Sequence, residues 1–258
     1  MSFNILDGAE GTGPENTSTV RLDAIVELIE SQKPDLLVLC ECNGFEQHGS
    51  RRLHEVEQHL GMQGSMAVAA TGYHVAIFAR DATWVSAKPL HGFYHAALRA
   101  KLVMQGEPVT VVGAHLCPFS AQLRLVEAEI LANEARADER VILMGDLNSL
   151  SPLDDTREIL DAMPPRYQVR HRGASEHADT RALEVLMKAG FIDLADRHDA
   201  REYTCSTSLV PAPSKSPLRI DYILATPLLA RHSQSFAVCR GPVAEQASDH
   251  YAVVAAFD

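Results

Sequence analysis

The sequence lacks both a long apolar run and a secretion signal. No stretch of about 18 apolar residues is present that could span a membrane, and residues 1–6 are too short for the apolar part of a signal peptide. We therefore expect a cytoplasmic protein. A strand is predicted directly after Met1, so a further segment could precede it in a longer protein.

Cysteine is scarce, and its spacing suggests neither disulfides nor a zinc site. The five cysteines are odd in number and include no C-x-x-C pair with partner histidines. Buried free thiols are the better interpretation. The cysteines are Cys40, Cys42, Cys117, Cys205 and Cys239.

Basic residues are in the minority. The chain has 23 Lys and Arg against 34 Asp and Glu, a formal net charge of -11. This charge opposes the attraction to phosphate backbones that supplies much of nucleic-acid affinity. It does not exclude a nuclease, because a magnesium site is itself rich in carboxylates and a local basic stripe can exist on an acidic protein. Net charge therefore only ranks the possible substrates.

Repeats and low-complexity tracts are also absent, which excludes repeat architectures. The chain has 258 residues, of which 46% are hydrophobic and 22% charged. These values are typical of a globular protein with a sizeable core. We expect a single domain over residues 1–258.

Segments typical of strands and helices alternate along the chain. Leu22, Ile25 and Ile29 follow helical spacing after possible caps at residues 16–18, and Pro34 ends this helix. The run at 36–40 is continuously apolar, as in a strand covered on both faces. Further strands are predicted at 3–6, 65–70, 74–80, 83–87, 97–104, 109–115, 140–145, 219–225 and 251–257, and helices at 53–60, 121–137, 153–160 and 180–189. This order indicates an α/β sandwich of two packed sheets with helices outside.

Three predicted loops contain clustered Gly, Pro and Ser and should frame the substrate. They cover residues 8–14, 163–178 and 206–217. Residues 164–173 form the only strongly positive loop, which makes Arg170 a candidate contact if nucleic acid binds. Residues 8–13 lack the lysine and spacing of a phosphate-binding loop, so a rim loop is the better interpretation.

Acids, amides and histidines follow several predicted strands. Each cluster alone has a commoner explanation as a turn or a surface cap, and only their conjunction points to chemistry. The clusters are Glu41, His115, Gly145-Asp146-Leu147-Asn148, Arg219-Ile220-Asp221-Tyr222 and Ser248-Asp249-His250.

These residue types match the needs of phosphate ester hydrolysis. That reaction needs a hard cation held by oxygen ligands, an oriented water and donors for the developing charge. Glu41, at the end of a buried strand, is a candidate Mg²⁺ ligand that Asp249 could join. Asp146 and Asn148 would point to the same side if the strand geometry continued past Asp146. One would then accept from water and the other donate to phosphate.

Asp221 and His250 can form a carboxylate–imidazole pair. In such a pair the acid fixes the tautomer of the ring and controls its charge.

Together these residues resemble the endonuclease/exonuclease/phosphatase family, which includes AP-endonucleases, pancreatic-type deoxyribonucleases, deadenylases, sphingomyelinases and inositol polyphosphate phosphatases. The resemblance spans the whole chain. It rests, in order, on Asn4, Glu41, the segment 72–78, Ala114-His115-Leu116, the segment 145–148, the segment 219–224 and Ser248-Asp249-His250.

The resemblance implies a four-layer α/β/β/α sandwich of two mixed sheets with the site at one rim. It implies Mg²⁺, or alternatively Mn²⁺, bound by Glu41 with help from Asn4 and Asp249. Asp146 and Asn148 would orient the water and the phosphate, while His115 and His250, the latter held by Asp221, would stabilise the pentacovalent transition state. Substrate contacts are expected from Asn4, His74, Asn148 and Arg170.

The sequence departs from two branches of the family. The pancreatic-type branch supports the histidine at the position of His115 with a glutamate, whereas the strand that would supply it here reads Tyr73-His74. AP-endonucleases usually have a tyrosine where His115 stands. The pattern of His115 followed by Arg124 and Glu127 resembles deadenylases, sphingomyelinases and unassigned bacterial members. We expect Arg124 to anchor its helix and not to touch phosphate.

Two substrate classes remain open. A nuclease acting on a DNA or RNA phosphodiester is favoured by the family set and by the positive segment 164–173. A phosphatase or phosphodiesterase for a small molecule or lipid head group is favoured by the acidic charge. A silent binding module would be expected to have lost some of the catalytic set. We expect a monomer without a membrane span.

Overall fold

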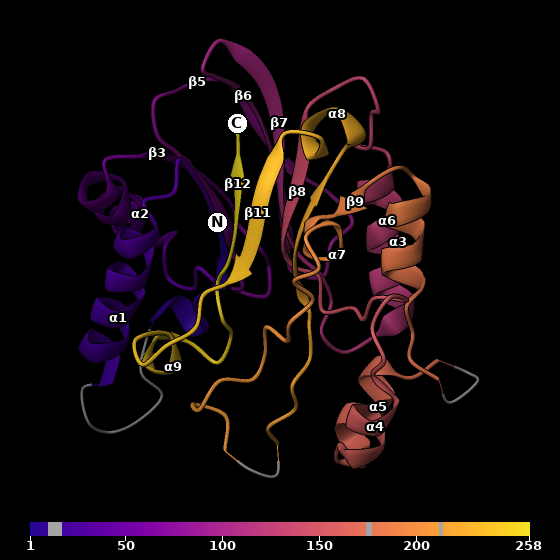
Figure 1. Ribbon diagram of the computed structural model, residues 1–258. Coiled ribbons are helices and arrows are strands. Elements are labelled where there is room, and N and C mark those ends of the chain that lie inside the picture. The colour runs from indigo at the N-terminus through magenta and orange to yellow at the C-terminus, as the bar shows by residue number, and fades with distance from the viewer. Residues whose placement is uncertain (10–16, 174–176, 212–213) are drawn as a thin grey trace.

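The computed structural model describes residues 1–9, 17–173, 177–211 and 214–258, and contains two mixed sheets of six strands each (Figure 1). The first sheet has the order β11 (Ser233–Val238), β12 (Val253–Phe257), β1 (Ser2–Asn4), β2 (Leu36–Cys40), β4 (Val75–Ala79) and β3 (Gln63–Ala67). The second has the order β5 (Ala82–Leu90), β6 (Ala96–Met104), β7 (Glu107–His115), β8 (Val141–Asp146), β10 (Asp221–Ala225) and β9 (Ile192–Asp193).

Helices cover the outer faces of both sheets (Figure 1). The first sheet is flanked by α1 (Thr17–Gln32) and α2 (Gln47–Leu60), and the short α9 (Ala244–Ala247) and the 3-10 turn η1 (Asp7–Ala9) both pack against α1. The second is flanked by α3 (Ala121–Ala132) and α6 (Arg181–Lys188). Four more short helices are α4 (Arg157–Ala162), α5 (Pro165–His171), α7 (Leu194–Arg197) and α8 (Pro227–Ala230). This arrangement confirms the predicted four-layer sandwich.

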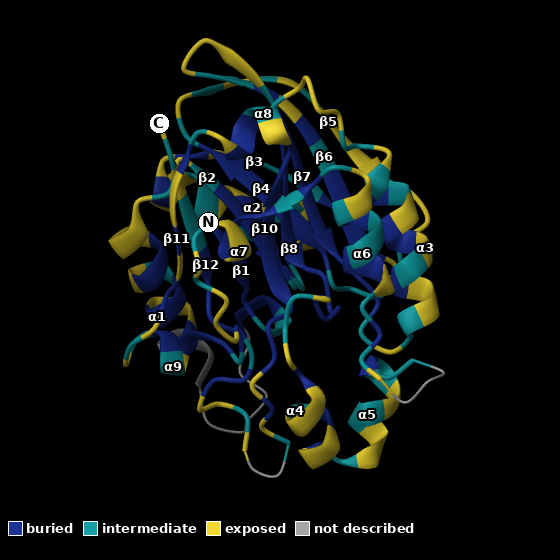
Figure 2. Cartoon of the chain, turned by 45° about the vertical axis from the view of Figure 1, so that its right-hand side comes forward, coloured by how far each residue is buried: buried dark blue, intermediate teal, exposed yellow. Residues whose placement is uncertain are grey.

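The core fills the space between the layers. The apolar strands β2 and β4 are covered on both faces, and the exposed residues lie mainly on the outer helices, the edge strand β5 and the loops (Figure 2). Ile25 and Ile29 of α1 belong to the same buried cluster as Leu39 of β2 and Val111 of β7, so one cluster joins the first helix layer to both sheets. A second cluster joins α3 and α6 to the second sheet, for example through Leu131, Leu183 and Leu143.

The register brings several strand ends to one rim. Asn4 pairs with Cys40 in the parallel strands β1 and β2, so Glu41 follows directly at the same edge. In the second sheet, His115 pairs with Asp146, which in turn pairs with Asp221. The end of the sandwich from which α4, α5 and α9 project in Figure 1 therefore carries the predicted site residues.

The structure corrects several expected elements. The predicted loop at 163–178 contains the helix α5, because Pro165 at its first position is preset for helical geometry. The helix predicted at 153–160 begins only at Arg157. Strands β11 and β9 are not predicted, since β11 is a half-polar edge strand and β9 has two residues. The caps proposed at Asn16 and most of the loop at 8–14 lie outside the described residues.

Within the described ranges, no helix combines the length and the apolar character that crossing a bilayer requires. The five cysteines are free thiols, as predicted. Four of them are buried, and Cys205 is half-buried.

Candidate active site

The turn after β8 depends on Gly145. This residue has φ of +148°, and a Cβ placed on it would lie 1.8 Å from the carbonyl oxygen of Ala114. Only glycine permits so close an approach between β7 and β8. The close approach sets Asp146, the last residue of β8, directly opposite His115.

Asp146 and Asn148 are brought together by a turn and not by an extended strand, which corrects the expected geometry. Asn148 has φ of +48°, and its backbone N–H donates to Asp146 Oδ1 over 2.9 Å. Its side-chain amide donates to the carbonyl oxygen of Leu116 over 3.1 Å. The carboxylate of Asp146 is thereby fixed by its own turn, as in an Asx turn.

Asn4 connects the two sheets at the rim. Its Nδ2 donates to Glu41 Oε1 and to Asp146 Oδ2, each over 3.0 Å, while its Oδ1 accepts from the backbone N–H of Leu6. Two carboxylates from different sheets therefore share one amide nitrogen. As oriented here, Asn4 positions both carboxylates, because its oxygen is already bonded to the backbone.

Glu41 is held in a strained backbone conformation. Its φ is +62°, which is uncommon for a residue with a side chain and concentrates at functional sites. Its Oε2 accepts from the backbone N–H of Asp7 over 2.9 Å. Burial raises the pKa of Glu41, and the negative charge of Asp249 adds to this effect. Two neighbouring carboxylates of this kind are well suited to hold a divalent cation through oxygen ligands.

Asp221 and His250 form the predicted pair. His250 Nδ1 lies 2.8 Å from Asp221 Oδ2, which also accepts from the hydroxyl of Thr204 over 2.6 Å. The same Thr204 oxygen accepts from the backbone N–H of Asp221. Burial alone would lower the pKa of His250, but the charge of Asp221 above all raises it well beyond the usual value. The contact with Asp221 therefore favours the protonated form of His250.

Burial shifts the pKa values of both His115 and Asp146. Burial lowers the pKa of His115 to about 4, so the ring is neutral near pH 7. Burial, with the charge of Asp221 next, raises the pKa of Asp146 to about 6. His115 Nε2 lies 3.5 Å and His250 Nε2 3.9 Å from Asp146 Oδ2. One neutral and one charged imidazole thus face the same carboxylate.

Two groups of residues could hold a metal. Asp146, Asp221 and His250 offer ligand atoms that all lie within 4.8 Å of one another. Within that group, His250 Nδ1 is already bonded to Asp221. The second group is Glu41 with Asp249, whose negative charge acts on the Glu41 carboxyl.

His74 does not offer a ring nitrogen to the site, contrary to expectation. His74 is buried, its Nδ1 accepts from the N–H of Ala69 and its Nε2 lies 2.7 Å from Glu46, so both nitrogens already contact protein. This geometry gives His74 a structural role and leaves no ring nitrogen for substrate. Arg170 lies on α5 with its guanidinium 5.1 Å from the ring centre of Phe119. Arg124 is buried and anchors backbone, as predicted.

Some site residues carry no signal in the sequence. Thr204 is a single hydroxyl residue in a loop, yet it orients Asp221 by donating to its carboxylate over 2.6 Å. Arg21 of α1 donates to the carbonyls of Ile5 and Leu6 over 2.7 and 2.6 Å. Their roles follow from tertiary contacts alone.

The comparison with protein families decides the identity of the fold. A model of the endonuclease/exonuclease/phosphatase family matches residues 1–250. The chain belongs to this family. Membership supports a hydrolase that acts on phosphate esters, of the phosphodiesterase or nuclease type.

Solved structures of this family share the fold at low sequence identity. An AP endonuclease from Archaeoglobus fulgidus superposes with a TM-score of 0.70 at 21% identity, covering 100% of this chain and 98% of that one. D. rerio TDP2 complexed with single strand DNA product gives 0.68 at 17%, with 98% and 95% covered. A family protein from Bacteroides thetaiotaomicron gives 0.68 at 16%, with 98% and 94% covered. No curated protein matches the sequence significantly.

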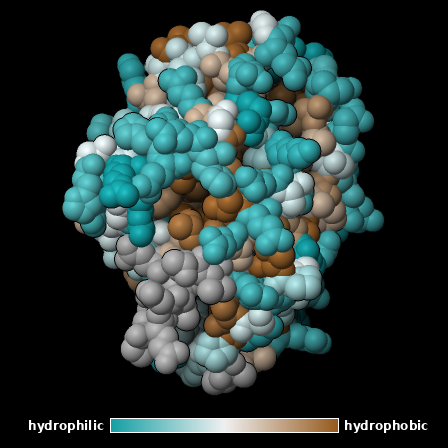
Figure 3. All heavy atoms as spheres, turned by 90° about the vertical axis from the view of Figure 1, so that its left-hand side faces the viewer, coloured by the Kyte–Doolittle hydropathy of each residue, from teal (hydrophilic) through white to brown (hydrophobic). Residues whose placement is uncertain are grey.

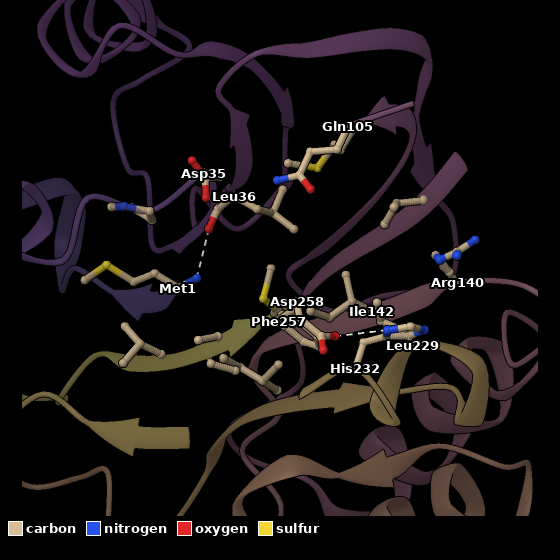
Figure 4. Close-up of a pocket in the computed structure, with 18 of the residues that line it drawn as sticks. Met1, Asp35, Leu36, Gln105, Arg140, Ile142, Leu229, His232, Phe257 and Asp258 are labelled. Atoms are coloured by element: carbon tan, nitrogen blue, oxygen red, sulfur yellow. Dashed lines mark hydrogen bonds and ion pairs between the residues drawn. The ribbon is translucent and has the colours of Figure 1, made fainter. Parts of the chain in front are cut away.

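Two cavities of this endonuclease/exonuclease/phosphatase domain lie away from the rim. One, of about 420 Å³, is at the opposite end of the sandwich, where the amine of Met1 donates to Leu36 and His232 pairs with Asp258 (Figure 4). The other, of about 440 Å³, is an apolar groove between α1 and α2 on the face shown in Figure 3. Neither contains the acidic and imidazole groups of the site.

Proposed function

We propose that this chain is a divalent-metal-dependent phosphodiesterase, with Mg²⁺ as its ion and nucleic acid as its substrate. The observation that carries the proposal is the single amide of Asn4, which joins Glu41 to Asp146 while His250 and His115 face the same Asp146 carboxylate. Groups that are far apart in the sequence thus share contact with one small volume, as the positioning of a reacting group requires.

Glu41 and Asp249 would hold the ion, with Mn²⁺ as a possible substitute. A bound divalent cation neutralises charge on phosphoryl oxygens and lowers the pKa of bound water. Asn4 would keep the Glu41 carboxylate aimed at that position. The raised pKa of Glu41 supports this assignment, because a buried carboxylate beside Asp249 gains most from a cation.

The protein's own groups would then divide the work. Asp146 would accept a proton from the attacking water, and Asn148 would help to position Asp146 and the phosphate. His250, kept charged by Asp221, would donate to a phosphoryl oxygen as negative charge develops there. His115, neutral near pH 7, can donate one hydrogen bond to the phosphate without adding charge.

A nuclease is the favoured form of the proposal. The solved structures of similar fold include an AP endonuclease and a TDP2 complexed with single strand DNA product. The helix α5, which projects from the same end of the sandwich as the site (Figure 1), carries Arg166 and Arg170. The second candidate is a phosphatase or phosphodiesterase for a small molecule or lipid head group, and the net charge of -11 favours it. We also propose that the protein is cytoplasmic and monomeric. Size-exclusion chromatography tests the oligomeric state.

A substrate panel tests the proposal. The protein is incubated with Mg²⁺ and supercoiled plasmid, abasic duplex, single-stranded RNA or a set of phosphomonoesters, with and without excess EDTA. Asp146→Asn is the test variant. Asp138→Asn, an exposed carboxylate before the opposite end of β8, is the control. We expect metal-dependent cleavage of a nucleic acid, which Asp146→Asn abolishes and Asp138→Asn does not. Cleavage of phosphomonoesters only would rule out the nuclease.

A further inference from the structure

A row of aromatic rings leads from His115 to the solvent. His95 stacks on His115 with ring centroids 4.4 Å apart, Tyr94 lies edge-on to His95 at 4.9 Å, and Phe119 lies edge-on to Tyr94 at 5.8 Å. The Phe119 side chain is 54% exposed and that of Tyr94 41%. We call Tyr94, His95 and Phe119 the aromatic wall. Grouped large rings left open to water beside a reactive site indicate a binding surface more than an accident of packing.

The aromatic wall is held in place by a buried charged residue. Glu127 of α3 is 2% exposed, and its two oxygens accept from the backbone N–H groups of Tyr94 and Cys117 over 2.6 and 2.8 Å. These two bonds fix the loop before β6 and the loop after β7 relative to each other. Because the buried carboxylate accepts hydrogen bonds from both loops, the exposed rings are held rigid, which lowers the entropy cost of stacking a ligand on them.

Arg124, one turn away on α3, attaches a third segment. Its guanidinium donates to the carbonyl of Cys117 over 3.0 Å and to the carbonyl of Arg170. The guanidinium of Arg170 lies 5.1 Å from the ring centre of Phe119 and 4.9 Å from that of Tyr167. The row of rings therefore ends in a positive charge, although the chain as a whole is acidic.

A flat ring joined to a phosphate fits this arrangement best. Aromatic side chains stack on the faces of nucleobases, and a guanidinium can stack on a base or bind a phosphate. Tyr94 and Phe119 expose their rings to solvent, while the buried His95 links them to His115. We propose that the aromatic wall and Arg170 bind the nucleobase next to the scissile phosphate. This rests on the proposed function only in placing that phosphate beside His115.

A binding measurement without catalysis tests the assignment. Phe119→Trp places an indole on the wall, and Trp84→Phe removes the only native tryptophan, which lies on β5. The double variant is titrated in EDTA with each of the four ribonucleoside 5′-monophosphates and with ribose 5-phosphate. We expect at least one nucleotide to quench the indole fluorescence saturably, with an apparent Kd at least about fivefold lower than that of ribose 5-phosphate. Equal quenching by ribose 5-phosphate, or none by any nucleotide, overturns the proposal.

A kinetic comparison separates a binding role from a general defect. Phe119→Ala and Tyr94→Ala should each raise KM for a dinucleotide about tenfold and change kcat by less than about threefold, because the variant loses the stacking contact with one base. The same variants should leave KM for a dinucleotide analogue without bases unchanged. Val169→Ala, a 73% exposed position on α5, is the control. An equal rise of KM for both substrates contradicts the assignment.

The two assays distinguish the possible failures. If no phosphodiester is cleaved but the indole still responds to nucleotides, the proposed activity is wrong while the binding site remains. If a phosphodiester is cleaved but KM does not depend on the presence of a base, the proposed activity holds and the proposed base-binding site is wrong.

Discussion

His250 Nδ1 lies 2.8 Å from Asp221 Oδ2, and this contact keeps the histidine charged. The pKa of His250 is raised well above its usual value chiefly by the charge of Asp221, so the proton should stay on the ring as the pH rises. Loss of that charge has a direct kinetic consequence.

Asp221→Asn should lower kcat by about 100-fold and move the alkaline limb of the pH profile to lower pH. The amide removes the charge that keeps His250 protonated, and protonated His250 is the form that donates to phosphate. The measurement is kcat against pH from 5 to 10. Asp258→Asn is the matched control, because Asp258 pairs with His232 at the far end of the sandwich. An alkaline limb that Asp221→Asn leaves in place would refute the role of the pair.

The acid limb should report Asp146. Its pKa is raised to about 6 by burial and by Asp221, and only the carboxylate form can accept a proton from water. Activity should therefore fall as the pH drops below about 6, by up to tenfold per unit. A bound cation favours the carboxylate, so raising the Mg²⁺ concentration should move this limb to lower pH. Activity that keeps increasing below pH 5 is the contrary result.

Gly145→Ala should destabilise the fold by at least about 3 kcal/mol. The added methyl group would meet the carbonyl oxygen of Ala114 at 1.8 Å, and backbone cannot move aside cheaply. Gly106→Ala is the control, because its φ is also positive, at +84°, but its Cβ meets no atom within 4 Å. Urea unfolding followed by circular dichroism gives both values. Equal losses in the two variants would show that backbone conformation matters and the contact does not.

His171 should make the protein less stable as the pH falls. Burial, helped by the charges of Arg124 and Arg170, lowers its pKa from 6.5 to about 3. Between these two values the unfolded chain binds a proton that the folded chain does not, so stability is lost as the pH drops below about 6.5. The loss attributable to this residue is about 1.4 kcal/mol at pH 5.5.

Urea unfolding at pH 7.5 and 5.5 measures this effect. His171→Gln should remove its share of the difference between the two pH values, while His91→Gln, at an exposed position, should not. An identical pH dependence in wild type and His171→Gln would exclude the contribution of His171.

The sequence predicts the rim because Glu41 and Asp146 stand at the ends of apolar strands. Glu41 follows β2 and Asp146 ends β8, so the sheet register alone brings them to one edge. Two further features depend on contacts that no local pattern records. Thr204 reaches Asp221 through a loop, and Asn148 leaves the extended geometry because its N–H bonds to Asp146.

The aromatic wall is hidden from sequence analysis for a different reason. Tyr94 and Phe119 lie in separate loops that meet only because Ala96 pairs with His115 in the β6–β7 hairpin. Exposed rings of this kind leave no periodic signal. The helix α5 is similarly concealed, because the pair Pro164-Pro165 stands at its start. A Pro-Pro pair is more typical of a loop.

The most direct test of the proposed phosphodiesterase site measures hydrolysis of bis(p-nitrophenyl) phosphate by wild type, Asp146→Ala, His250→Ala and the control His232→Ala. Each protein is assayed after EDTA dialysis and again after Mg²⁺ is restored. Activity should require Mg²⁺, fall at least about 100-fold in Asp146→Ala and in His250→Ala, and stay unchanged in His232→Ala. Turnover that persists in EDTA, or that survives loss of Asp146 and His250, would contradict the proposed site.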